Sequence, residues 1–177
     1  MKGSLKKILP VILLVWPYIF FLLSRVKNET AGTILFWAYL ILTIVVYVSN
    51  IANACMYKGE DAYYTLARWN MVIKLGHVPF YLLVFAVGVV FLMASVVPAL
   101  MFVTPVVIFY LVMIDLFLMI TSSVYGISAL LQAKHRGEIS LKYLIGHGIL
   151  HFVFVGDVIS GIMVFWRLRR QKRDERG

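Results

Sequence analysis

Five long apolar segments constrain the fold of this 177-residue chain more than any other feature of its sequence. They comprise residues 8–24, 33–57, 78–97, 105–131 and 141–166, and polar residues flank each of them. About 20 apolar residues in a helix are enough to cross a hydrocarbon core of about 30 Å. Because irregular backbone does not face lipid, such segments should be helical. We therefore predict an all-α integral membrane protein, a bundle of about five transmembrane helices.

Composition supports this fold class and limits the organisation of the chain. Hydrophobic residues make up 62% of the sequence and charged residues 14%, whereas soluble domains carry about 25% charged residues. A water-soluble fold is therefore excluded. We expect one transmembrane domain over residues 1–166 and a basic tail over 167–177. The net charge of +9 is concentrated in flanks and in this tail, which favours contact with anionic membrane lipids over nucleic acid.

Several catalytic classes lack their usual motifs. Cys55 is the only cysteine, so one chain has no disulfide, CxxC pair or cysteine-based metal cluster. The sequence has no GxSxG elbow, P-loop or dinucleotide-binding glycine motif, which are the usual parts of serine hydrolases and nucleotide-driven proteins. We expect no catalytic residues and favour a protein that is not an enzyme.

The first segment and the residues before the third segment differ from simple spans. The segment 8–24 is a marginal span because it is short and contains Pro10 and Pro17; we predict that it is retained, since no small-residue cleavage site follows it. Residues 60–77 are predicted to form an amphipathic helix before the third span. Its first half should lie along the membrane interface, and the polar face of its second half should meet the other helices. The third and fourth segments should form a tight antiparallel hairpin.

Basic residues do not settle the orientation of five spans. Nine Lys or Arg residues fall on the side of the N-terminus and eight on the other side. The densest run follows the last span and favours a cytoplasmic C-terminus in the cell membrane. It includes the residues that we expect to contact lipid headgroups, which are Arg167, Arg169, Arg170, Lys172 and Arg173.

Polar side chains inside the predicted spans point to a site. Asp115 and Asp157 are costly in a bilayer, and ionisable groups there are usually functional. Alternating helix directions place most of the other polar groups in one membrane leaflet and leave the opposite leaflet apolar. We predict a one-sided polar pocket that binds or translocates a small molecule, a lipid or a proton. Its expected members are Asp115, Asp157, His147, His151, His77, Lys74, Asn50, Asn53, Tyr47, Ser122 and Tyr125.

Two other function classes stay open. His147 and His151 have the i, i+4 spacing of a metal-binding pair, and His77 could complete a metal or haem site. Gly148 stands where a zinc protease has its glutamate base, so only a binding or redox role is considered. The polar pocket that we predict as the main hypothesis requires no cofactor. The other alternative is a structural subunit whose polar leaflet contacts a membrane protein partner.

Overall fold

The computed structural model describes residues 3–23, 25–151 and 154–174, which form helices and no strand. The helices are α1 (Gly3–Leu23), α2 (Glu29–Met56), α3 (Ala62–Ala94), α4 (Val103–His135), α5 (Leu141–Leu150) and α6 (Phe154–Asp174). The prediction of an all-α fold is confirmed. Ser24, which ends the first predicted span, and residues 175–177 of the predicted tail lie outside the described residues.

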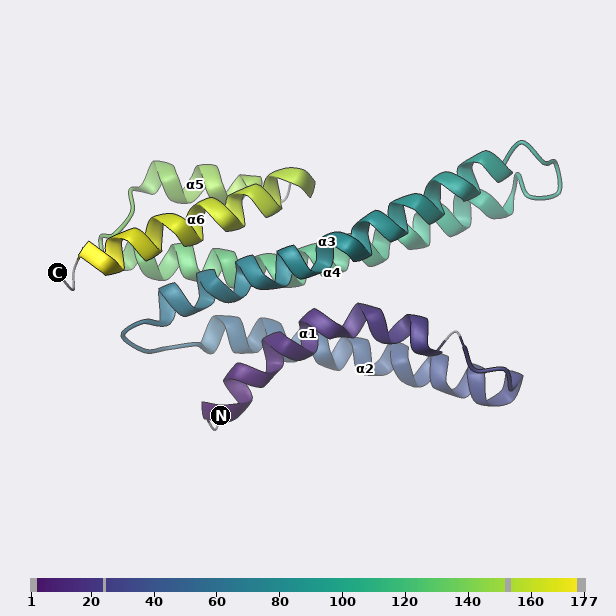
Figure 1. Ribbon diagram of the computed structural model, residues 1–177, viewed down its shortest axis with the longest axis horizontal. Helices are drawn as coiled ribbons and strands as arrows, with labels where there is room; N and C mark the ends of the chain where they lie inside the picture. Colours follow the sequence, from purple (N-terminus) through teal and green to yellow (C-terminus); the bar gives the residue numbers. More distant parts are fainter. Residues whose placement is uncertain (1–2, 24, 152–153, 175–177) are drawn as a thin grey trace.

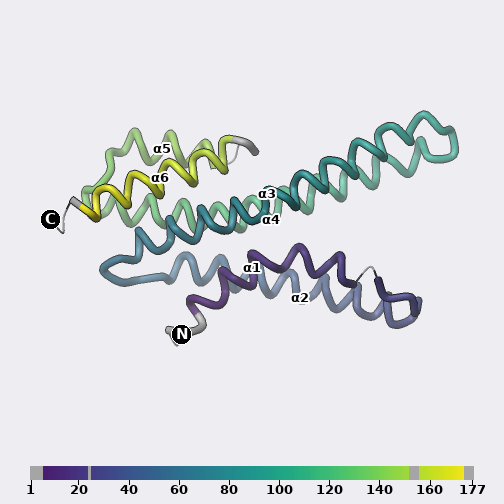
Figure 2. The backbone as a smooth tube through the Cα atoms, in the orientation of Figure 1, coloured from purple at the N-terminus to yellow at the C-terminus, as the bar shows by residue number. Residues whose placement is uncertain are grey.

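Three antiparallel helical hairpins form the structure (Figure 1). The long central hairpin, α3 and α4, confirms the hairpin predicted from the short uncharged connection. The α1–α2 hairpin packs against one side of it, and the α5–α6 hairpin packs against the other side. The backbone trace in Figure 2 shows both chain ends at the same end of the molecule, beside the α2–α3 and α4–α5 connections.

Four helices, α1 to α4, are long and apolar enough to cross a membrane. Their outward surfaces carry large apolar side chains, among them Ile44, Phe85 and Met93, which are 65%, 69% and 71% exposed. The predicted spans 33–57, 78–97 and 105–131 largely coincide with these helices, and 8–23 lies within α1.

The separate interfacial helix predicted over 60–77 is wrong. Helix α3 continues without a break from Ala62 through Pro79 to Ala94. Its first half contacts α6 and buries Tyr63 and Leu66. Packing against α6 therefore stabilises the first half of α3 inside the bundle. This stabilisation is larger than the tendency of its polar face to lie at the membrane interface. Pro79 removes one N–H donor, which a long helix tolerates when neighbouring helices pack around it.

The prediction of a single spanning helix over 141–166 is also wrong. The chain forms α5, of 10 residues, and then returns as α6. Ten helical residues extend only about 15 Å, half the thickness of a hydrocarbon core. Residues 152 and 153, inside the predicted span, lie outside the described residues. The predicted N-cap is confirmed, since the Ser140 side chain accepts a hydrogen bond from the backbone N–H of Tyr143.

Candidate functional site

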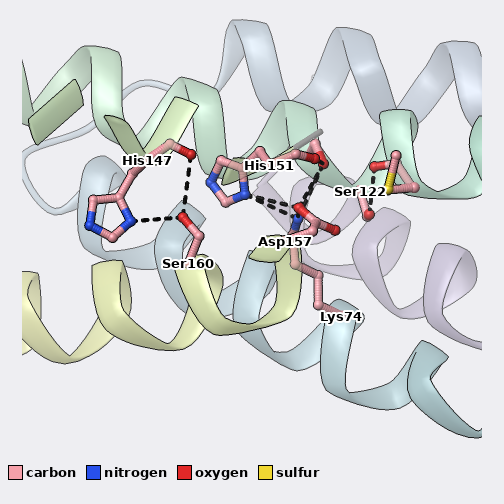
Figure 3. A network of polar contacts seen from close by, with 8 residues as sticks. Lys74, Ser122, His147, His151, Asp157 and Ser160 are labelled. Carbon is pink, nitrogen blue, oxygen red and sulfur yellow. Dashed lines mark hydrogen bonds and ion pairs between the residues drawn. The ribbon is translucent and has the colours of Figure 1, made fainter. Parts of the chain in front are cut away.

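Four helical elements bring charged and polar side chains together at the tip of the α5–α6 hairpin (Figure 3). Lys74 comes from α3, Ser123 from α4, His151 from the C-cap of α5 and Asp157 from the first turn of α6. The Lys74 ammonium pairs with Oδ1 of Asp157. We call these four residues the tip cluster.

Hydrogen bonds complete the tip cluster around the Asp157 carboxylate. Nδ1 of His151 lies 2.9 Å from Oδ1 of Asp157, and Oγ of Ser123 lies 3.1 Å from the same oxygen. Ser123 Oγ also lies 3.0 Å from the His151 backbone carbonyl. Because a carboxylate only accepts hydrogen bonds, Nδ1 of His151 carries the proton when it bonds to Asp157. In the other tautomer Nδ1 accepts from the Lys74 ammonium, which lies 3.2 Å away. The carboxylate also lies at the N-terminal end of α6, where the helix dipole favours negative charge.

The tip cluster is sealed from the exterior of the molecule. Lys74 and Asp157 are each 1% exposed, and His151 is fully buried. A buried charge costs several kcal/mol unless it is paired, so the two charges must be present together. The pairing neutralises both charges and holds the first turn of α6 against α3.

Three buried polar atoms, one in the tip cluster and two beside it, have no hydrogen-bond partner in the described structure. They are Nδ2 and Oδ1 of Asn70 and Nε2 of His151. Both side chains face Gly126: a Cβ atom at this glycine would lie 2.5 Å from His151 Nε2 and 2.9 Å from Asn70 Nδ2. Glycine is therefore required for the close approach of these side chains to α4. Unpartnered buried polar groups are rare and call for an explanation.

His147 has a different set of partners from His151. Its Nδ1 lies 2.8 Å from Oγ of Ser160, a contact that joins α5 to α6. The pKa of His147, which lies outside the four candidate spans, is lowered by burial and further by the charge of Arg167. The imidazole is therefore neutral at neutral pH and serves as a hydrogen-bonding group.

The three histidines considered for metal or haem do not share a site. His147 contacts Ser160, His151 contacts Asp157, and Nε2 of His77 donates to the Leu13 carbonyl on α1. Among the side chains that the structure describes, no three His, Cys, Asp or Glu residues are placed to hold a metal ion.

Asn53 and His77 contact backbone carbonyls that prolines leave free. A proline has no N–H, so Pro10 and Pro17 cannot donate to the carbonyls four residues earlier, those of Lys6 and Leu13. Asn53 Nδ2 lies 3.2 Å from the Lys6 oxygen, and His77 Nε2 lies 3.1 Å from the Leu13 oxygen. These two predicted pocket residues therefore fasten the marginal helix α1 to α2 and α3.

A second polar network joins α2 to α4. The Tyr125 hydroxyl donates to Oδ1 of Asn50 at 2.7 Å, and Asn53 Nδ2 donates to the Tyr125 hydroxyl at 3.2 Å. Asn50 Nδ2 donates to the Val46 carbonyl within α2. All three network side chains are buried, and their donors are satisfied by one another or by backbone.

Asp115 lies apart from the tip cluster. It faces an apolar groove of about 550 Å³ between α3 and α4, lined by residues such as Val84 and Leu111. Its Oδ1 has no hydrogen-bond partner. Tyr47, another predicted pocket residue, is half-buried and close enough to feel the charge of Asp115. The two predicted aspartates therefore occupy separate environments.

Two residues of the site, Ser123 and Asn70, are not among those predicted from the sequence. Ser122, which was predicted, donates to the Met119 carbonyl of its own helix, whereas its neighbour Ser123 enters the tip cluster. Asn70 belongs to the polar face that was expected to turn inward with Lys74 and His77, and all three are buried. That face was the available signal for Asn70, but no local pattern distinguishes Ser123 from Ser122.

The fold and these contacts define the class of protein. It is a small all-helical protein with four helices long and apolar enough to cross a membrane, and with a buried polar cluster at the tip of an additional helical hairpin. The chain belongs to a family of unknown function (DUF6652), which it matches over residues 4–170. No curated protein and no solved structure matches the chain.

Proposed function

We propose that this is a multi-pass membrane protein that binds a small uncharged molecule at the tip of a re-entrant α5–α6 hairpin. The observation that carries the proposal is the group of unpartnered atoms on Asn70 and His151, buried beside Gly126. Leaving such atoms without partners costs about 1–3 kcal/mol for each group. A ligand that supplies the missing hydrogen bonds accounts for their presence.

The charges of the tip cluster indicate which ligand chemistry fits. Lys74 and Asp157 neutralise each other, so the groups left for a ligand are the neutral Asn70 amide and Nε2 of His151. The amide both donates and accepts, and Nε2 of His151 accepts in the tautomer whose Nδ1 donates to Asp157. A small molecule that donates and accepts hydrogen bonds, such as a primary amide or an alcohol, meets both requirements.

Binding from one side fits the distribution of polar groups better than passage through the membrane. The α5–α6 hairpin extends from the end of the bundle that holds the chain ends to about the middle of the α3–α4 hairpin (Figure 1). In the distal half, residues 78–94 of α3 and 103–120 of α4 contain one charged residue, Asp115. A translocation path would need polar lining through both halves. We therefore favour binding over transport among the activities that the sequence suggests.

The α5–α6 hairpin also changes the distribution of basic residues between the two ends of the molecule. Because α6 returns to the end where α5 begins, its basic residues join those of the N-terminus and of the α2–α3 and α4–α5 connections. The α1–α2 connection at the opposite end carries Arg25 and Lys27, and the α3–α4 connection carries no charge. By the positive-inside rule, this distribution supports our proposal that both chain ends lie in the cytoplasm.

The single native cysteine allows a direct test of this orientation. Cys55 is exposed in the last turn of α2, at the end that we assign to the cytoplasm. A membrane-impermeant maleimide should label Cys55 only after the cells are opened. In Cys55→Ser/Val96→Cys, the thiol lies in the α3–α4 connection, where Val96 is 85% exposed, and it should react in intact cells. Labelling in the reverse order would overturn the orientation.

Asn70→Leu tests the binding site. If Asn70 is retained for a ligand, the variant should raise the unfolding free energy of the ligand-free protein by about 1 kcal/mol, because an unpartnered buried amide is removed. The corresponding rise in Tm is about 2–4 °C. In lipid nanodiscs, formamide should shift the ¹⁵N resonance of His151 Nε2 saturably in the wild type and not in Asn70→Leu. The resonance is assigned by its loss in His151→Gln.

Asn50→Leu is the matched control, because it also removes a buried amide but one that is hydrogen-bonded to Tyr125. It should lower Tm and keep the formamide response. Dimethyl sulfoxide, which accepts but does not donate hydrogen bonds, should produce no saturable shift. An unchanged His151 resonance in formamide, or equal responses in the wild type and Asn70→Leu, would refute the proposed site.

A purely structural role is the second candidate. The contacts of Ser123, His151 and Asp157 hold the hairpin tip without any ligand, as a scaffold subunit would require. This role gives no reason for Asn70 to be unpartnered. It predicts no response to formamide, so the same titration distinguishes the two functions.

A further inference from the structure

We propose that a basic cleft between the C-terminal half of α6 and the start of α3 binds the phosphate of an anionic lipid headgroup. The cleft encloses about 1140 Å³. Its wall includes Tyr64, Trp166 and five cations, which are Arg167, Arg169, Arg170, Lys172 and Arg173. The tip cluster contributes none of these residues, so this proposal stands independently of the proposed function.

Among the side chains that the structure describes, two of the five cations in the cleft wall have no partner and can bind an anion. Lys172 pairs with Asp61 and lies 4.7 Å from the centre of the Tyr64 ring. Arg167 and Arg169 lie over the rings of Tyr143 and Trp166. Arg170 and Arg173 are exposed, and no ion pair or hydrogen bond occupies them within the described part of the chain. Their i, i+3 spacing places both guanidinium groups on one helix face, where they can bind phosphate oxygens in pairs.

An exposed apolar stripe continues the same face of α6 toward the hairpin tip. Ile159, Met163 and Trp166 are 51%, 52% and 60% exposed. With Arg170 and Arg173 they follow the i, i+4, i+7, i+11, i+14 spacing of a single helix face. The face is thus apolar up to Trp166 and cationic beyond it.

This order matches an amphiphile better than a free anion. Tryptophan is enriched where acyl chains meet headgroups, and basic residues lie just outside that level. A lipid can place its acyl chains along Ile159 and Met163 while its phosphate reaches Arg170 and Arg173. Inorganic phosphate would use only the cationic part. The geometry therefore indicates a lipid carrying net negative charge.

Thermal unfolding of the full chain in a neutral detergent tests the proposal. Dioctanoyl phosphatidylglycerol should raise Tm saturably, because a ligand that binds the folded state stabilises it. Dioctanoyl phosphatidylcholine, whose choline cation opposes the arginines, should not. Arg170→Gln/Arg173→Gln should raise the half-saturating concentration of phosphatidylglycerol by about 25-fold, about fivefold for each cation near the membrane surface.

Arg25→Gln/Lys27→Gln is the matched control. It removes the same charge at the opposite end of the molecule and should leave the half-saturating concentration unchanged. Equal weakening in both double variants, or no saturable rise with phosphatidylglycerol, would overturn the cleft as the site. A Tm rise with inorganic phosphate alone, matching that with the lipid, would overturn the assignment to a lipid.

Discussion

Asp157→Leu is expected to lower the free energy of unfolding by about 3–5 kcal/mol, because it leaves the Lys74 ammonium buried without a counter-charge. Both side chains are 1% exposed, so water cannot take the place of the carboxylate. For a chain of this size, the loss corresponds to a Tm decrease of roughly 10 °C. Thermal unfolding in lipid nanodiscs measures it.

The double variant Lys74→Met/Asp157→Leu should recover most of this loss. Replacing both partners of a buried ion pair by apolar side chains is often neutral or stabilising. Each single variant should therefore be less stable than the double variant, which gives a large coupling energy between the two positions. If the losses in the single variants simply add in the double variant, the ion pair does not hold the hairpin tip.

Asp115→Leu serves as the control for the loss of a carboxylate inside the membrane domain. Asp115 is half-buried at an apolar groove, and its Oδ1 has no hydrogen-bond partner. Its removal leaves no buried cation unpaired, so Tm should stay the same or rise. A decrease as large as that of Asp157→Leu would show that the effect is not specific to the tip cluster.

Hydropathy predicts the helices that can cross a membrane because transfer into lipid depends on local composition. The segments 33–57, 78–97 and 105–131 follow this rule and largely coincide with parts of α2, α3 and α4. Local hydropathy does not predict the break between α5 and α6. The tip is stabilised by Lys74 and Ser123, which are distant in sequence. A window over 141–166 contains no information about these partners, so an average over its apolar residues predicts one uninterrupted helix.

In the candidate site, too, local sequence predicts some features, and contacts between residues distant in sequence decide the others. Inward-facing polar residues are predictable, since a polar stripe such as Asn70, Lys74 and His77 has no stable place in lipid. The partners of each residue are not predictable from spacing. His77 and Asp157 were assigned to one pocket, yet His77 contacts the Leu13 carbonyl on α1 and Asp157 closes the hairpin tip.

The contact between His77 and α1 leads to the second large effect. His77→Leu should lower the free energy of unfolding by about 2–3 kcal/mol, because the Leu13 carbonyl, which Pro17 deprives of its helical donor, loses the hydrogen bond from His77. Leu13 and His77 are both fully buried, so no water reaches the carbonyl. Thermal unfolding in nanodiscs should show a Tm decrease of roughly 8 °C.

Pro17→Ala provides the compensating change. An alanine at this position has an N–H that can donate to the Leu13 carbonyl, four residues earlier in α1. In the Pro17→Ala background, His77→Leu should therefore cost less than half of what it costs in the wild type. Pro10→Ala is the matched control, because it restores a donor to the Lys6 carbonyl, which Asn53 contacts, and leaves the Leu13 carbonyl unchanged.

If Pro17→Ala and Pro10→Ala rescue His77→Leu equally, then general stiffening of α1, and not the His77 hydrogen bond, explains the rescue. If neither variant rescues it, His77 stabilises the fold through packing and not by replacing the missing proline donor.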